Sequence, residues 1–152
     1  MAVTDRLNVH PSTLPGRAAL HDPVAQALLL LRIGFTVAPI LFGLDKFFDV
    51  LVRWEMYLAP QVPDALNMSA SAVMNIVGVI EIVAGLAVAV TPRFGGWLVA
   101  GWLAGIIINL LVLGDFYDVA LRDFGLLLAA LTLTRLATAA HHDRLHMSRL
   151  SS

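Results

Sequence analysis

Four long apolar stretches constrain this chain more than any other feature, because together they occupy most of its length. They cover roughly residues 25–47, 70–91, 95–114 and 118–138. A helix of about 20 residues crosses the ~30 Å hydrocarbon core of a bilayer, and each stretch is near that length. The whole chain is 59% hydrophobic, well above the share found in soluble domains. We therefore predict an all-α integral membrane protein.

The connections between these stretches predict which helices are neighbours. The second connection, "TPRFGG", and the third, "GDFYDV", are too short to let consecutive helices separate. Consecutive helices should then run antiparallel, which gives an up-down-up-down four-helix bundle. The first connection is longer and holds Trp54, Tyr57 and two prolines, so we expect a short helix there at the membrane interface.

The same pattern divides the chain into an arm over residues 1–24, a four-helix domain over 25–138 and a polar tail over 139–152. The arm is compatible with a short surface helix or with a loosely ordered tail. Positive residues that flank membrane helices favour the cytoplasm. Arg53 lies outside the spans on one side, whereas six arginines flank them on the other: Arg6, Arg17, Arg93, Arg135, Arg144 and Arg149. Both termini should therefore be cytoplasmic.

Composition excludes several classes of function. The net charge of −1 leaves no basic excess for nucleic acid, and the absence of cysteine excludes thiol chemistry and thiolate metal sites. No histidine falls within a stretch, which argues against a haem held by two histidines. His141, His142 and His146 include a pair four residues apart, but without neighbouring carboxylates we interpret them as ordinary polar residues and expect no metal site.

Charged and small residues recur at helical spacing inside the apolar stretches. Such spacing places side chains on one face of a helix, and small residues let helix backbones approach closely. We expect these faces to meet inside the bundle. The candidate packing residues are Gly43, Gly78, Gly85, Gly101 and Gly105, and the candidate interior polar site comprises Arg32, Lys46, Glu81, Asn109, Arg122 and Asp123.

A charge left alone near the bilayer centre costs ~2.5–3.5 kcal/mol, so these charges need partners. If the midpoints of the helices lie at equal depth, Arg32 lies ~7 Å from Glu81 along the membrane normal, a distance that an arginine side chain can cover. Lys46, Asn109 and Asp123 then fall within about two helical turns of one another. The sequence thus predicts two ion pairs, Arg32–Glu81 and Lys46–Asp123. Asp45, Asp115 and Arg122 should lie near the rim. Two interpretations stay open, a functional site centred on the deep carboxylate of Glu81 and charges that only fix helix register.

Three segments resemble the DoxX family of small four-span bacterial membrane proteins. "LLRIGFTVAPILFGLDKFF" is similar to the first span of that family, "VGVIEIVAGLAVAVTPRFGG" to the second and "LRDFGLLLAALTL" to the fourth. The matched positions are Arg32, Gly34, Gly43, Lys46, Glu81, Gly85, Arg93, Arg122 and Asp123. The resemblance covers about residues 25–138 and implies a multi-pass protein of the bacterial plasma (inner) membrane.

The resemblance also implies a link to membrane redox systems, but it transfers no catalytic residue and no intrinsic cofactor site. We expect a non-catalytic accessory subunit of a respiratory or quinone-linked oxidoreductase complex. Its partners would be the lipid bilayer and other membrane subunits. A homo-oligomer is also compatible with the sequence. An interior polar cleft would hold a quinone or lipid.

Two other functions remain as alternatives. One is a small proton-linked carrier, working as an oligomer and using Glu81, Arg32 and Lys46. The other is an enzyme, which has less support because the candidate acid and base neutralise each other.

Overall fold

The computed structural model describes residues 22–150, with side chains up to His142. All of its regular structure is helical, which confirms the predicted all-α class. The elements are α2 (Pro23–Asp45), the 3₁₀ helix η1 (Trp54–Tyr57), α3 (Gln61–Leu66), α4 (Ala70–Val90), α5 (Pro92–Leu113) and α6 (Tyr117–Leu150). The short helix expected in the first connection is present in two pieces, η1 and α3. Most of the N-terminal arm, including its candidate surface helix, lies outside the described residues.

Local chemistry explains where the long helices begin and end. Asp22 caps α2, because its side chain accepts a hydrogen bond of 3.0 Å from the Val24 amide, and Pro23 occupies the first turn. Ser69 caps α4 through the Ala72 amide at 3.2 Å. Gly114 ends α5 with a φ of 76°, a left-handed conformation that glycine adopts without strain.

Three helices, α2, α4 and α5, are long and apolar enough to cross a membrane. The chain is therefore a helical membrane protein. The fourth predicted stretch forms the N-terminal part of α6, which continues without a break to Leu150. At 34 residues α6 is ~51 Å long, more than a bilayer core requires. The tail expected from residue 139 is thus helical as far as Leu150.

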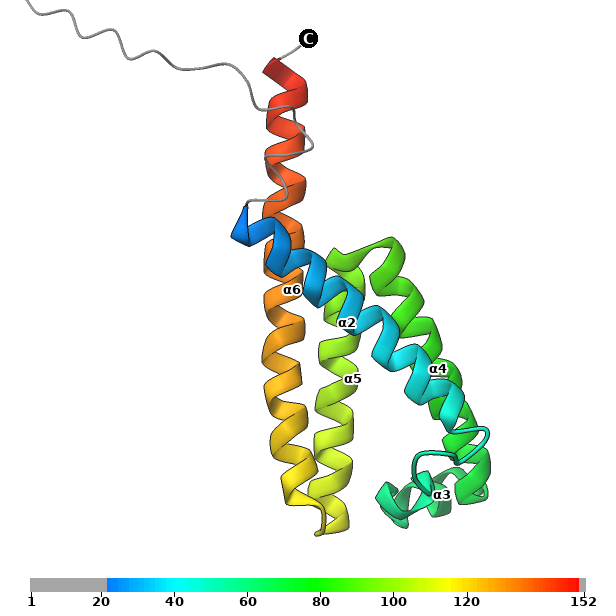
Figure 1. Cartoon of the computed structure of the whole chain (residues 1–152). Helices are drawn as coiled ribbons and strands as arrows, with labels where there is room; N and C mark the ends of the chain where they lie inside the picture. The colour runs from blue at the N-terminus through cyan, green and yellow to red at the C-terminus, as the bar shows by residue number, and fades with distance from the viewer. Residues whose placement is uncertain (1–21, 151–152) are drawn as a thin grey trace, which may run out of the picture.

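The long helices form two closely packed antiparallel pairs, α2 with α4 and α5 with α6 (Figure 1). The tight connection at Thr91 joins the pairs, and we call this the turn end of the molecule. The pairs diverge toward the opposite end, where α3 lies, which we call the loop end (Figure 1). The apolar core lies where all four long helices meet, and it comprises Phe35, Ala84, Val88, Val99, Ala100, Leu103, Ala130 and Leu133.

Glycines set the close packing of α2 on α4. A Cβ atom built on Gly43 would lie 2.6 Å from the Gly78 carbonyl oxygen, and one built on Gly78 would lie 2.6 Å from that of Gly43. A Cβ atom built on Gly85 would similarly lie 2.8 Å from the Thr36 carbonyl oxygen. The two backbones touch at these points because no side chain separates them.

The expectation that Gly101 and Gly105 pack inside the bundle is wrong. A Cβ atom on either would meet nothing within 4 Å, and both residues are exposed. The reason is that α5 buries the opposite face, which carries Val99 and Leu103, against its neighbours. Helical spacing identified the stripe but not which face of α5 would be covered.

The glycine contact predicts a matched pair of variants. Gly78→Ala should lower the free energy of unfolding by about 1–3 kcal/mol, because its methyl group would overlap the Gly43 backbone. Gly101→Ala should leave the stability unchanged or raise it by up to ~1 kcal/mol, since alanine favours helix and the site is open. Thermal unfolding in detergent measures both. Equal melting temperatures for the two variants would show that the helices do not touch at Gly78.

Candidate functional site

The site depends on how far α2 is displaced along α4. If the helix midpoints were level, Gly43 would lie opposite residues 73–74, but the structure places it opposite Gly78. This displacement is four to five residues, or ~7 Å along the helix axis. It moves α2 toward the turn end, so that Lys46 approaches the middle of α4. Arg32 moves in the same direction and comes to lie beside the last turn of α4.

Arg32 lies at the end of α4, and the predicted Arg32–Glu81 pair is wrong. The Arg32 guanidinium donates a hydrogen bond to the carbonyl oxygen of Ala89, in the last turn of α4. Carbonyls in the last turn have no partner within their own helix, and they carry the negative end of the helix dipole. Arg32 therefore supplies both a donor and a positive charge where α4 ends.

Lys46 and Glu81 form a buried ion pair. The Lys46 Nζ atom lies 2.7 Å from Glu81 Oε2, and the two side chains are only 4% and 10% exposed. Within the described part of the chain this is the one ion pair between side chains. The predicted Lys46–Asp123 pair is therefore wrong, because Lys46 is taken by Glu81.

Two tryptophans enclose this pair. The Lys46 Nζ atom lies 3.6 Å from the centroid of the Trp54 ring, a cation–π contact. On the other side, Trp102 Nε1 donates a long hydrogen bond of 3.5 Å to Glu81 Oε1. The sequence suggested only an interfacial position for Trp54. The contacts of the two tryptophans with the charges depend on helix register, which composition does not reveal.

Asp45 positions Trp54 and belongs to the same group, although the sequence placed it at the rim. Its carboxylate is buried and accepts bonds from the Val50 and Leu51 amides, both at 3.1 Å, and from Trp54 Nε1 at 2.7 Å. The chain after α2 therefore folds back over Lys46. The signal in the sequence was an acid beside Lys46 with a tryptophan nine residues later. We call Asp45, Lys46, Trp54, Glu81 and Trp102 the ion-pair cluster.

Asn109 holds the first connection against α5 and does not contact the ion pair. Its side-chain Nδ2 donates to the Tyr57 carbonyl oxygen at 2.6 Å, while its Oδ1 accepts from the Ala59 amide at 2.9 Å. The Tyr57 ring also packs on Phe116, with centroids 4.5 Å apart. Asn109 thus fastens the segment after η1 to the α5–α6 pair.

Asp123 and Arg122 lie outside the cluster on α6. Asp123 is half-buried and close enough to Lys46 and Glu81 to feel their charges, but it makes no side-chain hydrogen bond or ion pair with any described residue. Arg122 is exposed. Of the six predicted polar residues, only Lys46 and Glu81 are therefore in direct contact.

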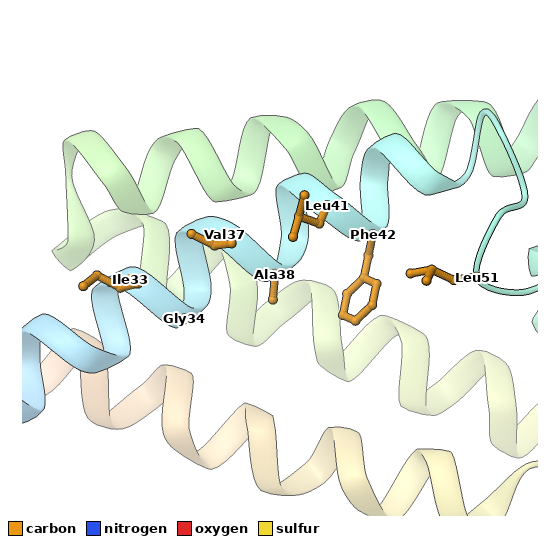
Figure 2. Close-up of a pocket in the computed structure, with 7 residues that line it drawn as sticks. All are labelled: Ile33, Gly34, Val37, Ala38, Leu41, Phe42 and Leu51. Carbon is orange, nitrogen blue, oxygen red and sulfur yellow. The ribbon is translucent and has the colours of Figure 1, made fainter.

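The charged side chains of the ion-pair cluster are packed against their partners. Asp45, Lys46 and Glu81 are all buried against their partners. A groove of about 390 Å³ lies along α2 and is lined by apolar residues alone (Figure 2). Each charge of the pair faces its counter-charge at 2.7 Å, so the two compensate each other within the apolar interior. The geometry is that of a clamp between helices.

Nothing in the described residues adds a metal centre. No three histidine, aspartate or glutamate side chains among them gather closely enough to hold an ion. His141 and His142 contact each other through their rings, and the side chain of His146 lies outside the described part. Comparison with family models, curated proteins and solved structures finds no match for this chain.

The Asn109 contacts predict a local effect on backbone protection. In Asn109→Ala the Ala59 amide, which lies in a fully buried residue, loses its acceptor, so its hydrogen exchange should become about tenfold faster or more. Exchange followed by mass spectrometry on peptides covering residues 57–62 measures this. Asn75→Ala, an exposed position on α4, serves as the control and should change nothing there. Unchanged exchange in Asn109→Ala would show that Asn109 does not hold this segment against α5.

Proposed function

We propose that this chain is a non-catalytic accessory subunit of a respiratory or quinone-linked oxidoreductase complex in a bacterial plasma membrane. The observation that carries the proposal is the closed Lys46–Glu81 pair, whose charges compensate each other and fix α2 to α4. Such a pair fixes two helices relative to each other, as a structural subunit requires. The likeness of its spans to DoxX proteins supplies the redox context.

The proposed topology has four spans, with α6 as the fourth and both termini in the cytoplasm. Three helices have the required length and hydropathy, and α6 packs antiparallel along α5 over the same interval. Positive residues lie mainly at the turn end and beyond it, which favours a cytoplasmic turn end.

Apolar faces on the outside of the helices support docking to other membrane subunits. On α4, Val79, Val83 and Leu86 recur at spacings of four and three residues, and each is about half exposed. Within a membrane such a face contacts either lipid or another helix. A partner subunit would dock on surfaces of this kind.

A proton-linked carrier is the second candidate, and one observation favours it. Asp123 brings a further carboxyl group within electrostatic reach of the Lys46–Glu81 pair, as a relay of protons would require. Against this, Arg32 caps α4 and does not join such a path. The carrier function would need the pair to open during each cycle.

Gentle extraction of the tagged full-length chain from native membranes tests the proposal. We expect quinone-reducing or quinol-oxidising activity to copurify with it, and not with an unrelated tagged membrane protein of similar size. A chain that purifies alone would contradict the accessory role. Proton flux into liposomes that is lost in Glu81→Gln would support the carrier instead.

A further inference from the structure

The apolar groove along α2 has the length and lining of a site for one lipid chain. It is bordered by Ile33, Gly34, Val37, Ala38, Leu41, Phe42 and Leu51 (Figure 2). The segment from Ile33 to Phe42 rises ~14 Å along the helix, close to half of a ~30 Å hydrocarbon core. One acyl chain of a single leaflet spans about that distance.

A second hollow is lined in part by charged residues, which follow Leu51 in the sequence. It measures about 380 Å³ and is lined by Arg53, Glu55 and Met56, beginning two residues after Leu51 closes the groove. The Phe42 ring that lines the groove meets Trp54 edge-on, with centroids 5.9 Å apart. Since Trp54 lies between Arg53 and Glu55 in the chain, this contact brings the backbone of the second hollow beside the Phe42 end of the groove.

The charges of the second hollow are unused within the described part of the chain. Arg53 and Glu55 are both exposed, and neither side chain forms an ion pair or hydrogen bond with a described residue. Arg53 is also the only lysine or arginine over residues 47–69. The hollow therefore presents one free positive and one free negative group next to an apolar groove.

We propose that the groove and the charged hollow together bind one phospholipid that has a primary ammonium headgroup, the chemistry of phosphatidylethanolamine. One acyl chain lies along α2, the phosphate faces Arg53 and the ammonium faces Glu55. Arginine favours phosphate because it donates charge-assisted hydrogen bonds to two oxygens at once. The paired opposite charges select a zwitterionic headgroup over an anionic one. This inference does not depend on the accessory-subunit function.

Two variants separate the tail site from the headgroup site. Gly34→Leu fills the groove, and a Cβ atom there meets nothing within 4 Å, so the variant should fold. Gly101→Leu places the same bulk at an equally open position on α5 and is the matched control. Glu55→Gln removes only the charge that faces the ammonium group.

Native mass spectrometry of the delipidated chain tests the site with an equimolar mixture of phosphatidylethanolamine, phosphatidylcholine and phosphatidylglycerol. The wild-type chain should retain one phosphatidylethanolamine about tenfold in preference to phosphatidylglycerol. Gly34→Leu should lose this retention while Gly101→Leu keeps it, and Glu55→Gln should abolish the preference between the two lipids. Equal retention of both lipids by the wild-type chain, or equal retention by Gly34→Leu and Gly101→Leu, would overturn the proposal.

Discussion

The buried contact between Lys46 and Glu81 is the interaction on which the rest of this structure depends. An uncompensated charge in an apolar interior has a large free-energy cost, so the stable packing of α2 on α4 is one in which the two side chains meet. Their meeting fixes α2 at one level along α4. The touching backbones at Gly43 and Gly78 allow that level, because a side chain at either position would hold the helices apart. Arg32 then reaches the last turn of α4 as a consequence.

The irregular segment after α2 completes this arrangement. Asp45 draws the chain back over Lys46 and brings the Trp54 ring onto the ammonium group. Asn109 fastens the same segment to α5 a few residues later. The loop end, where the two helix pairs diverge, is thus held by side-chain hydrogen bonds to backbone groups, whereas the turn end is held by apolar packing. The three buried charges of the described residues, Asp45, Lys46 and Glu81, accordingly lie on the loop side of the core.

The sequence was sufficient for the helical class and for the approximate limits of α2, α4 and α5, because apolar length is a local property. It missed the extension of α6 to Leu150, where the sequence is polar. It identified Lys46 and Glu81 as interior charges. It paired them wrongly because equal depth of the helix midpoints was assumed, while the glycine contact sets a different register. The packing prediction for Gly101 and Gly105 was wrong for a related reason. Periodicity shows which residues share a helix face, but not whether another helix packs against that face. The roles of Asp45 and Trp54 arise from a loop whose path no periodic pattern describes.

Double-mutant cycles on the free energy of unfolding in detergent test the central claim most directly. They compare the coupling of Glu81→Leu with Lys46→Met and with Arg32→Met. Our account predicts a coupling of about 1–3 kcal/mol between Lys46 and Glu81, and additive effects within ~0.5 kcal/mol for Arg32 and Glu81. A large coupling of Glu81 to Arg32, together with additivity for Lys46, would contradict the register described here.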